Sequence, residues 1–290
     1  MTEAYIYDAV RTPRGKGRSN GSLHEVTSVK LSSTVLNALK ERNNLEGHAV
    51  EDVIWGNVTQ IGEQGGCLAR TAVLASDLDE SIPGVSINRF CASGLEAVNM
   101  AANQVRGGGG HAYIAGGVEA MSRVPMGADG GAIAVDPSVA MEHYFVPQGI
   151  SADIIATEYG FTRDQADAMA VESQNRAKAA WDDRRFDNSV VAVRNVNGLT
   201  ILDHDEYMRP GTDMQALGSL NPSFQQIGEV MPGFDKVALM LHSYNKLGAP
   251  NRAPHPPHTQ PPVNLPNSPA TIPVDPPFNA STRQPISHTG

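Results

Sequence analysis

The hydrophobic positions of the first 120 residues follow two alternating periods. Short runs rich in Val, Ile and Tyr have the composition of buried strands, and segments with apolar residues at helical spacing lie between them. The predicted strands cover residues 5–10, 53–58, 85–87 and 112–118. The predicted helices cover residues 27–42, 69–76 and 95–105. This order of elements is typical of a layered α/β domain.

The pattern changes near residue 121, where Gly, Pro and Met become frequent and no strand order is evident. A helix is predicted from Ser151 to Gly160, followed by a longer one that begins with a capping box of Thr162 and Gln165 and continues to Trp181. Residues 190–193 and 199–202 predict a small hairpin. We interpret residues 121 to about 236 as a separate, mainly helical excursion from the α/β domain.

The end of the chain has another composition. Twelve of the 20 prolines lie between residues 250 and 290. Prolines at this density remove backbone donors, and the sparse apolar residues cannot offset the entropy of ordering. We therefore expect an α/β domain over residues 1–120, a loop domain over residues 121–240 and a Pro-rich disordered tail over residues 241–290.

The charge of the chain restricts its partners. The net charge is −9 at 290 residues, which argues against a protein that binds nucleic acid through its phosphates. Basic residues do gather near the start, where they either meet a phosphorylated cofactor or belong to a solvated loop: Arg11, Arg14, Lys16 and Arg18. Because there is neither a long apolar run nor a signal peptide, we expect a cytoplasmic protein without a membrane partner.

Cysteine is rare, with only Cys67 and Cys91 in the chain. Two cysteines are too few for a disulfide framework or a CxxC metal site, so no metal is predicted. Cys91 lies between a short apolar strand and a strongly predicted helix. The start of a helix offers free N–H groups and the positive end of its dipole, which favour the reactive thiolate. The alternative is a buried cysteine that serves packing only.

The residues around Cys91 also resemble a known motif. The segment from Ile87 to Val98, INRFCASGLEAV, followed by Val105, is similar to the acyl-enzyme signature of the thiolase family. Other segments resemble the same family in the same order: DAVRTP at 8–13, GNV at 56–58, AGGVEAMS at 115–122 and SQNRA at 173–177. The resemblance covers residues 3 to 239.

This resemblance implies the amino-terminal half of a thiolase-like layered fold, with a helical loop-domain insertion. It implies an acyltransferase of fatty acid and acyl-CoA metabolism in which Cys91 carries the acyl group as a thioester. Coenzyme A and acyl-CoA would be substrates, with no permanently bound cofactor and with a homo-oligomer, a dimer or tetramer, as the assembly. The substrate contacts implied by position are Met121, Met126, Gln148 and Gly149.

The resemblance also limits the expected chemistry. In the family, carbon–carbon bond formation uses a second cysteine, a histidine and an asparagine-held water of the carboxy-terminal domain. After residues 231–235 this chain departs from the family pattern, and no cysteine follows Cys91. We therefore expect acyl transfer to be retained at most, with the carbon–carbon step lost. A frameshift or gene fusion near residue 240 would explain the change.

Two other interpretations remain open from sequence. One is a non-catalytic remnant or interaction protein that retains the dimer surface of the fold. The other is a ketoacyl synthase relative, which shares the layered fold and a cysteine at a helix start. The residues Cys91 to Gly94 and the excursion after Met121 match thiolases better than synthases.

Overall fold

A computed structural model of the protein describes residues 3–143 and 148–223. These residues belong to the first of two units of the chain, Met1–Val237. The predicted tail, residues 241–290, lies outside the described residues. Of the helices in the described ranges, none combines the length and the hydropathy that crossing a bilayer requires.

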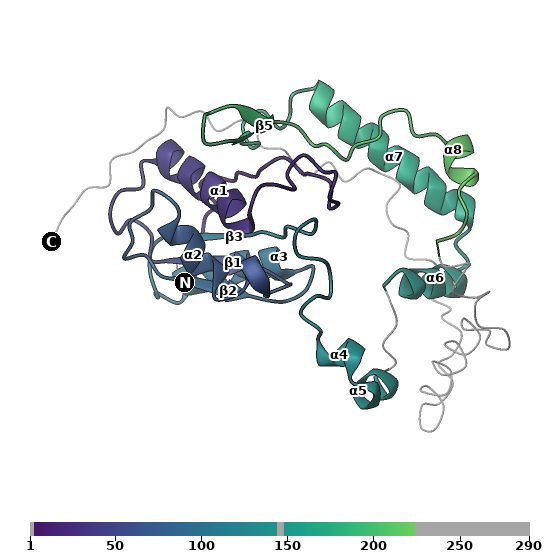
Figure 1. Cartoon of the computed structure of the whole chain (residues 1–290), viewed down its shortest axis with the longest axis horizontal. Helices are drawn as coiled ribbons and strands as arrows, with labels where there is room; N and C mark the ends of the chain where they lie inside the picture. The colour runs from purple at the N-terminus through teal and green to yellow at the C-terminus, as the bar shows by residue number, and fades with distance from the viewer. Residues whose placement is uncertain (1–2, 144–147, 224–290) are drawn as a thin grey trace. The chain divides into compact units, whose positions relative to one another are not determined.

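A parallel sheet of three strands forms the centre of the amino-terminal part (Figure 1). Its strands are β1 (Asp52–Gly56), β2 (Gly84–Ile87) and β3 (Tyr113–Gly117), in the order β2-β1-β3. β1 lies in the middle and pairs in parallel with both neighbours. Val53, Ile54 and Trp55 of β1 are buried, as the continuous apolar run of a strand covered on both faces requires.

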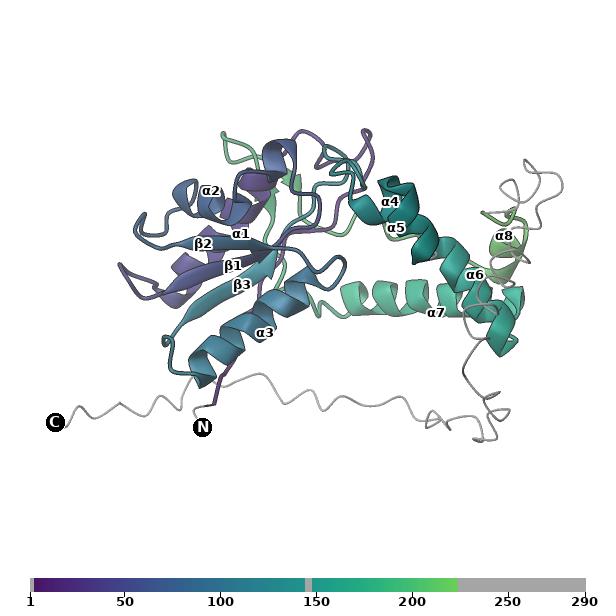
Figure 2. The same ribbon diagram turned by 90° about the horizontal axis from the view of Figure 1, so that it is seen from below.

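Helices α1 (Ser28–Asn43) and α2 (Leu68–Leu74) cover one face of the sheet, and α3 (Ser93–Arg106) covers the other (Figure 2). The start of α1 is fixed locally, because the Thr27 hydroxyl accepts a hydrogen bond from the backbone N–H of Lys30. Leu36 of α1 is fully buried in the core cluster between α1, α2 and β1, together with Trp55 and Val73. The predicted helices over residues 27–42, 69–76 and 95–105 and the predicted strands over residues 53–58, 85–87 and 112–118 are confirmed as these elements.

The chain after β3 is mainly helical. Its helices are α4 (Ala132–Val135), α5 (Pro137–Glu142), α6 (Gln148–Tyr159), α7 (Arg163–Asp182) and α8 (Met214–Gly218). The capping box at the start of α7 is confirmed: Gln165 N–H donates to the Thr162 hydroxyl, and Thr162 N–H donates to Gln165 Oε1. The predicted hairpin is confirmed as the antiparallel pair β4 (Val193–Arg194) and β5 (Thr200–Leu202).

This second segment returns to the amino-terminal residues. Val193 and Leu202 are buried in one cluster with Leu23, Val26 and Leu31. The backbone of Arg11 also makes two hydrogen bonds with the loop before β4, from its N–H to Ser189 and from the Val191 N–H to its carbonyl oxygen. Residues 189–202 thus contact residues 11–31, which lie far from them in sequence.

The predicted strand over residues 5–10 is wrong. These residues form no strand, and Tyr5, Ile6 and Tyr7 are 69%, 80% and 90% exposed. The apolar run has β-strand composition, but a strand also needs a neighbour to accept its backbone hydrogen bonds. The described residues provide that partner only at Arg11, as an isolated bridge to Val190.

The basic residues near the start are partly neutralised in the fold. Arg11 forms a bidentate ion pair with Asp205, with N–O distances of 2.7 and 2.9 Å. The Lys16 amine lies 3.9 Å from a carboxylate oxygen of Glu206. For these two basic residues the alternative of a phosphorylated cofactor is therefore not favoured.

Candidate active site

The carboxyl ends of the three parallel strands lie together at one end of the sheet. Open α/β sheets bind their ligands beside these carboxyl ends. β1 leads into the β1–α2 loop, residues 57–67, and β3 leads into Val118 and Glu119. β2 leads into residues 88–92, which we call the cysteine turn, and then into α3. The strand order places β1 between the segments that carry Cys91 and Glu119. Cys91 therefore stands beside the carboxyl ends of the strands.

The cysteine turn has an unusual backbone. Phe90 has φ +48°, a left-handed conformation that is rare for a bulky residue. The turn is closed by hydrogen bonds from Ala92 N–H to the Arg89 carbonyl and from Ser93 N–H to the Phe90 carbonyl, at 3.1 and 3.0 Å. The Ser93 hydroxyl accepts from Arg89 N–H at 2.8 Å and donates to the Phe90 carbonyl at 2.6 Å. The Ser93 side chain thus links Arg89 and Phe90 of the turn to the start of α3.

This geometry presents Cys91 to solvent at the start of a helix. The Cys91 side chain is exposed, and so is the neighbouring Phe90 ring at 66%. No side chain caps α3, whose N-cap residue is Ala92. Ser93 N–H is bonded to the Phe90 carbonyl, so it is the following N–H groups of the first turn, together with the positive end of the helix dipole, that can stabilise negative charge nearby. The predicted strand–cysteine–helix arrangement is confirmed, with the backbone strain at Phe90 rather than at the cysteine itself.

α3 can begin this close to the sheet because residue 56 is glycine. A Cβ at Gly56 would lie 2.6 Å from the Ser93 carbonyl carbon and 2.8 Å from the Gly94 nitrogen. A Cβ does not approach a non-bonded heavy atom this closely, so any larger residue at position 56 would displace the start of α3. The end of β1 and the cysteine turn are therefore in direct backbone contact.

A buried polar network holds the β1–α2 loop. Both oxygens of Glu119 are used: one accepts from Val58 N–H at 2.9 Å, and the other accepts from Thr59 N–H at 3.2 Å and from the Gln64 amide at 2.8 Å. The Gln64 side chain is fully buried, and its oxygen accepts from Ala120 N–H at 2.7 Å. The loop after β1 is thereby joined to the segment after β3.

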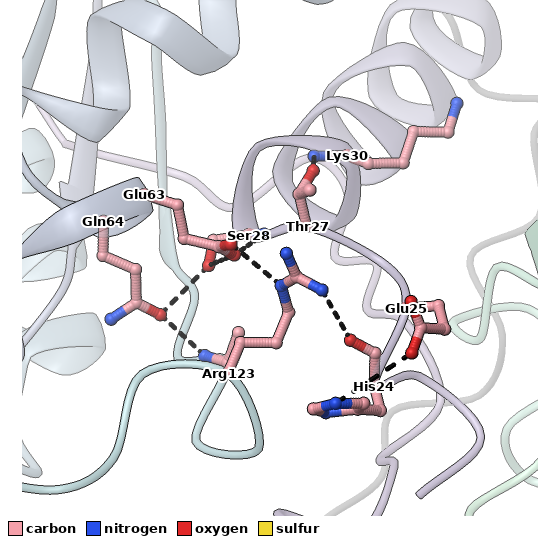
Figure 3. Close-up of polar contacts among 9 residues, drawn as sticks. His24, Glu25, Thr27, Ser28, Lys30, Glu63, Gln64 and Arg123 are labelled. Carbon is pink, nitrogen blue, oxygen red and sulfur yellow. Dashed lines mark hydrogen bonds and ion pairs between the residues drawn. The ribbon is translucent and has the colours of Figure 1, made fainter. Parts of the chain in front are cut away.

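The network continues to the start of α1 (Figure 3). Glu63 accepts from the backbone and hydroxyl of Ser28, both at 2.9 Å, and from Arg123 Nε at 2.8 Å. A second Arg123 nitrogen donates to the His24 carbonyl at 2.8 Å. Burial alone would raise the pKa of Glu63, but the hydrogen bonds from Ser28 and Arg123 outweigh it and leave this pKa below its ordinary value. Glu63 is thus held as a carboxylate.

Sequence reasoning missed this network. Glu119 was quoted only as part of a motif, and no role was predicted for Glu63 or Gln64. A signal did exist, because a carboxylate directly after a buried glycine-bearing strand needs hydrogen-bond partners. The partners themselves could not be foreseen, because Glu119 and Gln64 are 55 positions apart in the sequence.

The predicted substrate contacts occupy two segments. Met121 and Met126 follow β3 and are 42% and 79% exposed. Gln148 and Gly149 begin α6, where Gln148 is exposed and Gly149 is partly buried. Among the residues that the structure describes, no hydrogen bond joins any of the four to Cys91. Their role in substrate binding stays a prediction.

Cys67 differs from Cys91 in its surroundings although it is also exposed. It precedes α2 in a left-handed conformation, φ +62°, and its thiol donates to the Gly84 carbonyl at 3.3 Å. Gly84 begins β2, whereas Cys91 follows the end of that strand. Cys67 is therefore an exposed reference thiol whose local setting differs from that of Cys91.

Comparison with known proteins agrees with this arrangement. The family model described as "Thiolase, N-terminal domain" matches residues 4–234. The 3-ketoacyl-CoA thiolase of Colwellia psychrerythraea is 35% identical over 233 residues, which are 78% of this chain and 59% of the relative. That of Shewanella loihica is 38% identical over 233 residues, 77% of this chain and 58% of the relative. The beta-ketoadipyl-CoA thiolase of Pseudomonas aeruginosa is 38% identical over 239 residues, 76% and 59% of the two chains.

Together, the parallel sheet covered by helices and the family match define an α/β domain of the thiolase type. The chain belongs to the thiolase family, and residues 4–234 are its amino-terminal domain in that family. The chain spans somewhat under three-fifths of the length of the curated relatives named above. The match ends at residue 234, although the chain continues to residue 290.

Proposed function

We propose that this chain performs the acyl-transfer half of thiolase chemistry, with Cys91 as the acyl carrier. The supporting observation is the position of Cys91. Its exposed thiol follows Phe90, which has a left-handed backbone, and directly precedes the start of α3, which no side chain of the N-cap residue caps. A thiol in this setting is more accessible to a substrate than one packed in a core. No other cysteine of the chain follows a strand of the sheet in this way.

In the proposed step, Cys91 Sγ attacks the thioester carbonyl carbon of acyl-CoA. A new carbon–sulfur bond forms at Cys91, the carbon–sulfur bond to CoA breaks, and CoA leaves as the thiolate that takes up the proton lost by the cysteine. Negative charge develops on the carbonyl oxygen during the attack. We propose that backbone N–H groups at the start of α3 stabilise this charge.

The substrate is proposed to be an acyl-CoA, without a bound cofactor or metal. We propose that residues 1–120 carry the nucleophile and that residues 121–240 contribute CoA contacts through Met121, Met126, Gln148 and Gly149. Unlike the carbon–carbon step, the acyl-enzyme step removes no α-proton and makes and breaks only carbon–sulfur bonds. It is therefore the part of the reaction that the residues of this chain support best.

Isotope exchange tests the proposal because it needs only acylation and its reversal. The protein is incubated with acetyl-CoA or octanoyl-CoA and with labelled free CoA, and label in the acyl-CoA pool is measured. We expect exchange with at least one substrate, its loss in Cys91→Ser, and its retention in Cys67→Ser. A folded protein that exchanges neither substrate would contradict acyl transfer and favour a non-catalytic interaction protein.

A further inference from the structure

Asn88 is the first residue of the cysteine turn, and its side chain is exposed to solvent. The side-chain oxygen accepts a hydrogen bond from the Phe90 backbone N–H at 2.8 Å. The side-chain nitrogen donates to the Val58 carbonyl at 3.1 Å. One exposed amide therefore bridges the cysteine turn and the β1–α2 loop.

The first of these bonds bears on the strained residue. A bulky side chain in the left-handed region costs on the order of 1–3 kcal/mol, so the surrounding structure must enforce the conformation. Asn88 fixes the N–H of Phe90, and Ser93 fixes its carbonyl oxygen through a 2.6 Å bond. Cys91 follows Phe90 directly. The backbone dihedral angles of Phe90, which these bonds stabilise, therefore set the direction in which the Cys91 side chain leaves the backbone.

The second Asn88 hydrogen bond, to the Val58 carbonyl, joins the turn to the Glu119 network. Val58 accepts from Asn88 through its carbonyl and donates to the Glu119 carboxylate through its N–H, at 3.1 and 2.9 Å. Glu119 in turn is held by Thr59 and by the buried Gln64. The turn is thereby connected, through the backbone of Val58, to the network that joins the loops after β1 and β3.

We propose that Asn88 is a positioning residue for the Cys91 nucleophile, which it orients by clamping Phe90 in the left-handed conformation against the Val58 peptide. This inference rests on the proposed acyl-transfer function of Cys91. Asn88 does not itself contact the reacting sulfur, so its effect reaches the cysteine only through the backbone of Phe90. Ser93 holds the other side of the same residue.

Alkylation measures this role without acyl-CoA, because Cys67 serves as an internal reference. Iodoacetamide is added to the whole chain, and peptide mass spectrometry gives the ratio of the Cys91 rate to the Cys67 rate. In Asn88→Ala we expect this ratio to fall about tenfold, as expected for a misplaced reacting group. Asn88→Asp keeps the acceptor for Phe90 N–H but loses the donor to Val58, so its ratio should lie between wild type and Asn88→Ala.

Two further variants distinguish positioning from general loosening of the structure. Asn43 is another exposed asparagine with two hydrogen bonds, to Asp8 and to the Leu39 carbonyl, so Asn43→Ala should leave the ratio unchanged. Glycine adopts the left-handed conformation without strain, so adding Phe90→Gly to Asn88→Ala should restore part of the ratio. An unchanged ratio in Asn88→Ala would overturn the inference, as would an equal fall at both cysteines.

The same variants separate this inference from the proposed function. If wild type exchanges CoA, Asn88→Ala should lower the exchange rate at saturating acetyl-CoA more than it raises the KM. If wild type exchanges no CoA but the alkylation ratio still falls in Asn88→Ala, the positioning role holds and acyl transfer fails. If exchange occurs and Asn88→Ala changes neither reading, the positioning role fails alone.

Discussion

Gly56 and Ser93 are in backbone contact: a Cβ at Gly56 would lie 2.6 Å from the Ser93 carbonyl carbon. This contact sets how closely α3 approaches the sheet, and the cysteine turn is fastened to Ser93. The glycine at the end of the central strand therefore determines where Cys91 stands. Its effect can be measured separately from any chemistry.

Gly56→Ala should destabilise the protein by about 1–3 kcal/mol, the usual cost of overpacking, because a backbone atom must move. Urea unfolding measures the change. Gly94→Ala is the matched control, since a Cβ there meets nothing within 4 Å and alanine favours a helix. It should be neutral or stabilising. Equal effects of the two variants would show that this contact does not restrict residue 56.

Asp205 should give the protein a specific sensitivity to acid. Burial raises the pKa of Asp205, but the hydrogen bonds and charge of Arg11 outweigh it and hold this pKa below its ordinary value. A lowered folded-state pKa stabilises the fold above the unfolded value of about 4, and this contribution is lost as pH falls through the folded value.

Asp205→Asn should therefore melt at a lower temperature than wild type at pH 7, by the equivalent of about 1–3 kcal/mol for a hydrogen-bonded ion pair. The difference should shrink as pH is lowered toward 3. Exposed Asp129 supplies the control, because Asp129→Asn should leave the melting curve unchanged at every pH. A difference between Asp205→Asn and wild type that is constant with pH would argue against this ion pair as the source.

Ser32 should matter more than its neighbour Ser33. The Trp55 indole N–H donates to the Ser32 hydroxyl at 3.1 Å, and Trp55 is only 3% exposed. Ser32→Ala leaves that donor buried and unpaired, so it should cost about 1–3 kcal/mol of unfolding free energy. Ser33 is equally buried but bonds only to the Lys30 carbonyl, so Ser33→Ala should cost less. Denaturant titration with tryptophan fluorescence compares the two, and a larger loss in Ser33→Ala would contradict the account.

The capping box at α7 should be worth about 1 kcal/mol to that helix. Thr162→Ala removes the acceptor for Gln165 N–H, whereas Thr162→Ser keeps a hydroxyl there. Hydrogen exchange of the first turn of α7 should accelerate in the alanine variant and stay near wild type in the serine variant. Identical exchange in both would mean that the box does not hold the start of α7.

Helix starts were predictable from sequence because their determinants are local. Thr27 and Thr162 each cap a helix through residues three positions away. The strand predicted over residues 5–10 failed because a strand depends on a distant neighbour that composition does not reveal. Likewise, the partner of Arg11 is 194 positions away, so the sequence could not show that its charge is neutralised.

The candidate site was predictable to a similar degree. The strand, the cysteine and the helix start were predictable because both elements have clear local signals, but only the resemblance to thiolases made Cys91 the predicted nucleophile. The left-handed conformation of Phe90 had no such signal, because phenylalanine rarely adopts it. The Glu119–Gln64 network was also hidden, because it joins loops that only the sheet order brings together.

The most direct test of the central claim is to locate the acyl group. The protein is mixed with acetyl-CoA, quenched in acid and digested, and each cysteine peptide is weighed. We predict the mass gain of one acetyl group on the Cys91 peptide, none on the Cys67 peptide, and none on either in Cys91→Ser. Folded protein whose Cys91 peptide stays unmodified, or whose two cysteines are acetylated to the same extent, would contradict the assignment of Cys91 as the acyl carrier.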